Sequence, residues 1–130
     1  MQRNRIAFGV ALGLTLAVTR PVTAHHSFDA EYDSRKTATI TGYVTKLDWV
    51  NPHAYVFIDQ RDEAGNVASY KVEMGPPYAL VRAGWARDTI KAGDKVTVEG
   101  AALAKDGSHA AGSLPTTSMT LASGRKLGMR

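Results

Sequence analysis

Three short segments in the middle of the chain alternate β-branched and aromatic residues with polar ones. This period of two is typical of strands that bury one face of a sheet. Pro52 interrupts the pattern because it cannot donate a ladder hydrogen bond, and Gly65 with Asn66 suits a hairpin turn. The sequence therefore predicts an antiparallel meander. We expect its strands at residues 37–50, 54–60 and 67–74, with Gly42 at a bend in the first.

The hydrophobic period changes after this meander. Pro76 and Pro77 suit the first turn of a helix over residues 75–85, and Gly84 suits its end. The remaining expected elements are a turn at 92–94 with a fourth strand behind it, a loop at 104–113, and a weak fifth strand with a terminal hairpin in 114–129. Three strands, a helix and two strands are the order of an OB-fold. We therefore predict an all-β domain with one short helix, a small OB-fold-like five-stranded barrel; a β-sandwich of similar size is the alternative.

The first 24 residues have the pattern of a secretory signal peptide. Arg3 and Arg5 precede a short apolar run, and Val22 and Ala24 stand at the small-residue positions of a cleavage site. The run is shorter than the about 20 apolar residues that a membrane span needs, and an uncleaved anchor is the alternative. We therefore expect residues 1–24 to be removed on export. The expected product is periplasmic or secreted and has no membrane contact after cleavage.

The rest of the chain is long enough for one domain with one core, and too short for two. Residues 25–36 are polar apart from Phe28 and Tyr32, and we interpret them as an extended or loosely ordered N-terminal arm. The barrel domain is then expected to occupy residues 37–130.

The charge and the missing cysteines exclude several classes of function. The formal net charge is +4, but Arg3, Arg5 and Arg20 lie in the expected leader, so the remainder is nearly neutral. Without a basic run that could follow phosphates, we expect no nucleic-acid partner. The chain has no cysteine, which excludes thiolate metal sites and a cysteine nucleophile. No hydrolase, P-loop or HExxH motif is present, and we predict that the protein is not an enzyme.

Two adjacent histidines directly follow the expected cleavage site. A cut between Ala24 and His25 would leave an α-amine and an imidazole on one residue, and together they chelate a metal. A third nitrogen from His53, in the Asn-Pro-His break between two strands, would suit Cu(II), which favours tetragonal nitrogen coordination. The arrangement resembles the histidine brace of copper-dependent polysaccharide monooxygenases and of periplasmic copper carriers. The sequence therefore predicts a copper site at His25 and His53.

Neighbouring residues complete this hypothesis. We expect His26 to be an auxiliary ligand, and Trp49 and Asn51 to shape and shield the loop from outside the ligand set. A cut before Ala24 would instead place His26 third from the amine, which is a square-planar Cu(II) or Ni(II) chelate. The alternatives are a plain polar arm and a turn in which His53 only bonds the backbone. His109 follows Gly-Ser and is expected to face water.

Four short segments also resemble a family of small exported bacterial proteins whose function is unassigned. They are HHSF, WVNPH, GW and GDKVTVEG, and the similarity extends over nearly all of residues 25–130. The resemblance implies export and a small β-barrel, and it implies no activity. It places His25, His26 and His53 at motif positions and leaves His109 outside them.

Two functions of different classes therefore remain open. The first is an exported, non-catalytic protein whose partner is a metal ion, with copper as the expected cofactor. The second is an exported interaction or ligand-binding module, without metal, whose barrel face binds another envelope protein or a small ligand. A copper-dependent oxidase ranks third, because nothing in the sequence marks a substrate channel.

Overall fold

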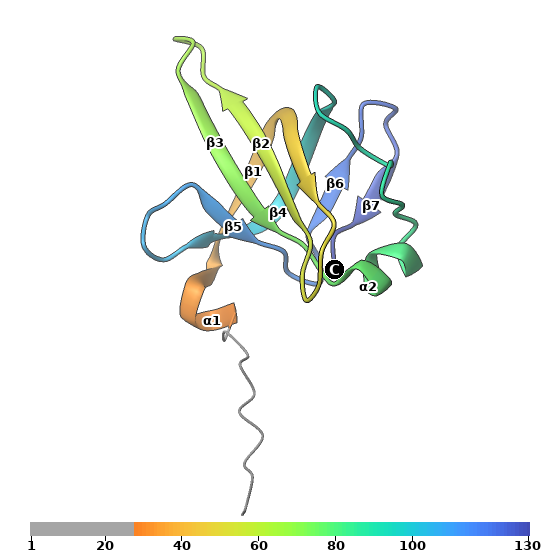
Figure 1. Cartoon of the computed structure of the whole chain (residues 1–130). Helices are drawn as coiled ribbons and strands as arrows, with labels where there is room; N and C mark the ends of the chain where they lie inside the picture. Colours follow the sequence, from red (N-terminus) through yellow and green to blue (C-terminus); the bar gives the residue numbers. More distant parts are fainter. Residues whose placement is uncertain (1–27) are drawn as a thin grey trace, which may run out of the picture.

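The computed structural model describes residues 28–130, which form seven strands and two short helices (Figure 1). In chain order these are α1 (Phe28–Glu31), β1 (Tyr32–Asp48), β2 (Tyr55–Arg61), β3 (Val67–Glu73), α2 (Pro77–Arg82), β4 (Lys95–Ala104), β5 (Ala110–Gly112), β6 (Ser118–Thr120) and β7 (Lys126–Gly128). Among these residues, no helix has the length and apolar character needed to cross a bilayer. The expected leader at 1–24, and residues 25–27 of the expected arm, lie outside the described residues.

Five of the strands pair in a closed ring. The order around it is β1-β2-β3-β5-β4, and β4 pairs back with β1. All of these pairings are antiparallel except the one between β3 and β5, which is parallel. The hairpin of β6 and β7 extends the sheet from β4. The prediction of a mostly β domain is therefore confirmed, and the meander of the first three strands lies where the alternation placed it.

The long first strand joins both sides of the ring because it bends. Its register shifts between Val44 and Lys46 against β2, and at two places against β4. Gly42 lies at a close approach, where a Cβ atom would collide with the carbonyl oxygen of Asp59. Bulges and glycines are the usual means by which a strand curves enough to pair on two sides. At Gly42, where the bend was expected, the backbone of β1 therefore lies close against the backbone of β2.

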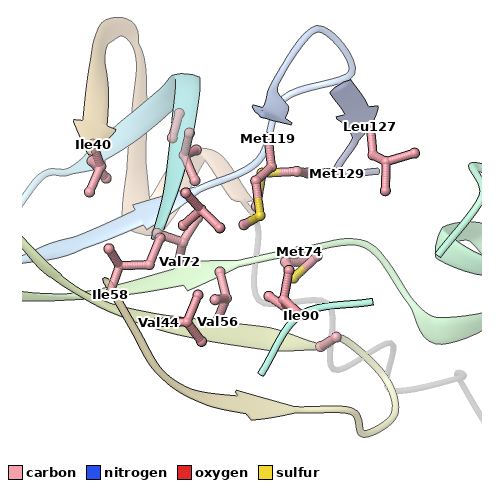
Figure 2. Packing of buried hydrophobic residues seen from close by; sticks show 14 of the residues in the cluster. Ile40, Val44, Val56, Ile58, Val72, Met74, Ile90, Met119, Leu127 and Met129 are labelled. Carbon is pink, nitrogen blue, oxygen red and sulfur yellow. The ribbon is translucent and has the colours of Figure 1, made fainter. Parts of the chain in front are cut away.

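The core fills the inside of the ring. Inward residues of the strands, such as Val56, Ile58 and Val72, are fully buried and meet Met119 and Met129 from the C-terminal segment (Figure 2). The short helix α2 adds only Leu80 to this core. Trp85, which follows the helix, is buried, and its Nε1 donates to the carbonyl oxygen of Gly128 at 2.7 Å.

One ring strand lies where the sequence predicts a loop. Residues 104–113 were expected to be irregular, but Ala110–Gly112 forms β5 and pairs with both β3 and β4. Its small side chains offer no alternation of large apolar and polar residues, so the local pattern gives no strand signal. The expected weak fifth strand is β6, which pairs with β4 and β7 and is not a member of the ring.

The predicted arm is also corrected in the part that the structure describes. Phe28–Glu31 is a helical turn, and β1 begins at Tyr32, five residues before the expected boundary at 37. Tyr32 is buried and pairs with Ala104 of β4. The side chains of Phe28 and Tyr32 pack against strand β5 at Gly112. Their burial orders a segment whose composition is otherwise polar.

Candidate metal centre

The backbone of the β1–β2 loop holds His53 beside the end of β3. Ala54 donates to the carbonyl oxygen of Gly75 at 3.2 Å and accepts from the amide of Met74 at 2.8 Å. These bonds continue the antiparallel pairing in which Tyr55 faces Glu73. His53 is therefore the diagonal neighbour of Glu73 on the same face of the sheet, a position from which side chains meet.

Glu73 connects His53 to the first strand. Its Oε1 lies 2.7 Å from Nδ1 of His53, and its Oε2 accepts a hydrogen bond from the hydroxyl of Tyr32 at 3.0 Å. The Glu73 side chain is 14% exposed and that of His53 is 36% exposed. Three elements thus converge on one carboxylate: the start of β1, the end of β3 and the loop before β2.

The contact at Nδ1 determines which nitrogen of His53 keeps a lone pair that could coordinate a metal. When a carboxylate accepts the Nδ1 proton of a neutral imidazole, Nε2 retains its lone pair. Metal-binding histidines commonly have this arrangement, because the carboxylate orients the ring and raises its basicity. The geometry therefore suits His53 as a metal ligand through Nε2.

The negative charge at Glu73 affects the two tyrosines beside it. Burial, the negative charge of Glu73 and their hydrogen bond raise the pKa of the Tyr32 hydroxyl well above its usual range, and Glu31 adds to this effect. Burial, with the charges of Glu73 and Glu31, also raises the pKa of Tyr55. On the other side of this cluster, Nζ of Lys71 lies 4.3 Å from the centre of the Tyr55 ring. The charges of two carboxylates therefore add to the effect of burial on the pKa of both tyrosines.

Phe28, the first described residue, lies against the same cluster. Its ring centre is 4.8 Å from that of Tyr32. Both rings cover Gly112 of β5, where a Cβ atom would lie 2.5 Å from Phe28 and 2.7 Å from Tyr32. Phe28 therefore lies next to the tyrosine that donates to Glu73.

Comparison with known proteins gives one match. A family model, DUF6152, described as a family of unknown function, matches residues 14–113. The chain belongs to the DUF6152 family. Comparisons with curated proteins and with solved structures gave no match. The DUF6152 match includes all four histidines and Glu73, and it ends before β6 begins at Ser118.

Only some of the predicted site residues of this DUF6152 protein lie in the part of the chain that the structure describes. His53 is at the cluster described above, whereas His25 and His26 lie outside the described residues. Trp49 is partly buried and packs against the core, and Asn51 is exposed in the loop before Pro52. Their proposed shielding role stays a prediction. Across residues 28–130, no group of three or more histidine, aspartate or glutamate side chains is arranged to hold a metal.

His109 is exposed, as expected, but it has a neighbour. Its ring centre lies 5.1 Å from that of Tyr70 on β3, and its carbonyl oxygen accepts from the amide of Lys71 at 2.9 Å. It belongs to the segment that leads into β5. His109 is therefore part of the β3–β5 junction.

Sequence reasoning missed Glu73 and Tyr32. The alternation of residues 67–74 places Glu73 on the outer face, but only the register of β2 against β3 shows that it faces Tyr55 and lies near His53. The polar composition around Tyr32 predicts an arm that does not pack on the domain. A pair of apolar aromatics four residues apart, Phe28 and Tyr32, was the one available signal that this segment packs on the domain.

Proposed function

We propose that this DUF6152 protein is an exported, non-catalytic copper-binding protein whose ligands are His25, His26 and His53. His25 contributes its α-amine and its imidazole after cleavage of the leader, and His53 contributes Nε2. The ring of five strands acts as a small OB-like barrel that holds the His53 loop in place. We further propose that Trp49 and Asn51 border the site.

The observation that supports this proposal most is the contact between His53 and Glu73. A carboxylate 2.7 Å from Nδ1 orients an imidazole in the manner of a metal ligand. The loop that carries His53 is itself tied to the end of β3 through Ala54. A ligand held by the fold in this way costs less conformational entropy when the metal binds.

The position of Phe28 supports the participation of the leading histidines. Three residues of extended chain span at most about 10 Å, which bounds the distance from Phe28 to His25. Phe28 packs on Tyr32, and Tyr32 donates to the carboxylate that contacts His53. This series of contacts from Phe28 to His53 supports the inclusion of the leading histidines in the proposed site.

The donor set favours copper over other ions. An amine and imidazoles are nitrogen ligands, and Cu(II) combines tetragonal nitrogen coordination with the highest affinity in the divalent series. Calcium and magnesium prefer oxygen ligands, and structural zinc sites usually include thiolates, which this chain lacks.

The test is a Cu(II) titration of the chain that begins at His25, after mass spectrometry of the exported protein has identified its first residue. We expect one tightly bound copper, with nitrogen couplings in the electron paramagnetic resonance spectrum. A chain with three extra residues before His25 is expected to bind at least tenfold more weakly, because the chelate formed by the amine is lost. One or two extra residues are unsuitable, since they would place His26 or His25 third from the amine.

Two results would overturn the proposal. The first is an exported protein whose first residue lies several positions before or after His25. The second is equal affinity of the processed and extended chains, which would leave the histidines incidental and favour an interaction module.

Replacement of Glu73 by glutamine is expected to weaken Cu(II) binding about tenfold, because a carboxylate that accepts from a metal-binding histidine and orients its ring typically contributes this much. The control is Glu99→Gln. Glu99 is also paired, with Nζ of Lys126 at 2.7 Å, but it lies on β4 and is more exposed. Competition with a chromophoric chelator measures both affinities. Equal affinities for the two variants would show that Glu73 does not position the ligand.

A further inference from the structure

We infer that Tyr32 is a positioning residue for His53. Its hydroxyl holds the carboxylate of Glu73 in the orientation that keeps the proton of the imidazole on Nδ1 and leaves Nε2 free to bind a ligand. All three side chains belong to the part of the chain that the structure describes. The assignment of a metal to Nε2 rests on the proposed function, whereas the arrangement of the three side chains can be tested without any metal.

The two oxygens of the Glu73 carboxylate have different partners. Oε2 accepts from the hydroxyl of Tyr32 at 3.0 Å, and Oε1 lies 2.7 Å from Nδ1 of His53. An ionised carboxylate only accepts hydrogen bonds, so the tyrosine and the imidazole both act as donors here. Turning the carboxylate away from His53 would also break its bond to Tyr32, and the Glu73 side chain is only 14% exposed, so little water is available to replace that bond. The Tyr32 hydroxyl therefore favours the orientation in which Oε1 faces His53.

The main chain of Glu73 is fixed by the residue after β5. Both the amide and the hydroxyl of Ser113 donate to the carbonyl oxygen of Glu73, at 2.9 and 2.7 Å, and Ser113 is buried. Glu73 is also paired with Gly112 of β5. Rotation about the side-chain bonds is therefore the freedom that remains to Glu73, and the bond from Tyr32 limits it.

Tyr32 suits this role because its ring is itself held in place. The residue is 7% exposed, and its main chain pairs with Ala104 of β4. The ring lies directly on β5, where a Cβ atom at Gly112 would be 2.7 Å from its Cδ2 atom. The ring of Phe28 lies beside it, with 4.8 Å between the ring centres. A buried ring packed in this way has little room to move, so the fold sets the position of the hydroxyl.

These contacts determine the tautomer of His53. A neutral imidazole carries its proton on one of its two nitrogens, and its hydrogen-bond partners decide which. A carboxylate at Nδ1 favours the proton there and leaves the lone pair on Nε2, as in many metal-binding histidines. The side chain of His53 is 36% exposed, so a ligand in solution can reach the ring. Loss of the Tyr32 hydroxyl should therefore alter the chemistry of His53 through Glu73.

The first experiment measures the tautomer of His53 in the metal-free, processed protein by nitrogen-15 NMR of labelled histidine. The spectrum is recorded at about pH 8.5, where an imidazole with an ordinary pKa is neutral, and His53→Ala identifies the His53 signals. We expect the wild-type ring to carry its proton on Nδ1. Tyr32→Phe removes only the hydroxyl and keeps the ring. We expect it to raise the ratio of the Nε2-protonated to the Nδ1-protonated form about fivefold, because the carboxylate loses one of its hydrogen bonds.

The matched control is Tyr43→Phe. Tyr43 lies on the same strand as Tyr32 and is paired with Asp59 of β2, so the change again removes a hydroxyl from a tyrosine of β1 that has a carboxylate on a neighbouring strand. Tyr43 is 53% exposed, and we expect its replacement to leave the tautomer ratio of His53 unchanged. Thermal unfolding of each variant shows whether the fold is retained at the temperature of the measurement.

The second experiment compares Cu(II) affinity in wild type, Tyr32→Phe, Glu73→Gln and the double variant. We expect Tyr32→Phe to weaken binding about threefold, which is less than the effect of Glu73→Gln, because the hydroxyl acts through the carboxylate. In the Glu73→Gln background the same change is expected to alter the affinity by less than about 1.5-fold, because the group that Tyr32 positions is gone.

The outcomes separate the role of Tyr32 from the proposed function. An unchanged tautomer ratio in Tyr32→Phe, or an equal change in Tyr43→Phe, would overturn the role of Tyr32. An equal loss of affinity on Tyr32→Phe in both backgrounds would also overturn it, because the effect would then not pass through Glu73. If His53→Ala weakens copper binding and Tyr32→Phe changes the ratio but not the affinity, Tyr32 does not position the metal ligand. A changed ratio together with wild-type copper affinity in His53→Ala would leave the three side chains arranged as inferred and refute the proposed copper site.

Discussion

Replacement of His53 by alanine is expected to weaken Cu(II) binding about a hundredfold. The terminal amine and imidazole form a chelate without His53, and a second ligand fixed on the same molecule adds affinity of this order through its effective concentration. His53 is fixed in this sense, since Glu73 holds its Nδ1 and Ala54 ties its loop to β3. The nitrogen couplings in the electron paramagnetic resonance spectrum should decrease by one imidazole.

The fold is expected to tolerate this change. The His53 side chain is 36% exposed, and Glu73 retains the hydrogen bond from Tyr32, so the cost to stability should be about 1 kcal/mol. His109→Ala is the control, because His109 is an exposed histidine beside Tyr70 and not beside Glu73. Equal affinities of the His53 and His109 variants for copper would refute a specific site.

Replacement of Trp85 by alanine is expected to destabilise the domain by about 3–5 kcal/mol, the usual cost of truncating a large buried aromatic residue. Trp85 is 3% exposed and belongs to the core cluster. Its loss would leave a cavity and remove the bond from Nε1 to the carbonyl oxygen of Gly128, which joins the segment after α2 to β7. Domains of this kind are stable by only about 5–15 kcal/mol, so the effect is a large fraction of the whole.

Urea unfolding followed by circular dichroism measures this loss without relying on tryptophan fluorescence. Tyr78→Ala serves as the control, because this residue lies on the neighbouring helix and is 66% exposed, and its change should cost less than about 0.5 kcal/mol. Trp85→Phe keeps an aromatic ring in the core but removes the hydrogen bond to Gly128, so it separates packing from hydrogen bonding. Its expected cost lies between those of Tyr78→Ala and Trp85→Ala. A loss below about 1 kcal/mol for Trp85→Ala would mean that α2 and its following segment contribute little to the core.

Local patterns were sufficient for most of the fold. Alternation, Pro52 and the Gly65 turn gave the three meander strands to within two residues, apart from the early start of β1. The double proline at 76 and 77 gave the helix, although it ends at Arg82 and not at 85. The expected turn around Ser123 and Gly124 lies between β6 and β7, as the amide of Gly124 donates to Leu121 at 2.9 Å. Each of these features depends on residues close together in the chain.

The candidate site was predicted only in part. His53 was identified from its place in the Asn-Pro-His break, but Glu73 and Tyr32 were not, because they lie 20 and 21 residues away in sequence and meet His53 through strand pairing. A glutamate on the outer face of a strand has the same local pattern whether it faces solvent or a histidine. Register decides between these, and register is a property of the packed sheet.

The sequence by itself determined the β-rich class of this protein, its central meander and the histidines available for chemistry, because side-chain periodicity and turn preferences act over a few residues. Only the tertiary structure decided that Ala110–Gly112 completes the ring, that Phe28 and Tyr32 lie on Gly112, and that one carboxylate holds both Tyr32 and His53. These contacts join distant segments, and they form because the closed ring of strands brings the ends of β1, β3 and β5 to one place.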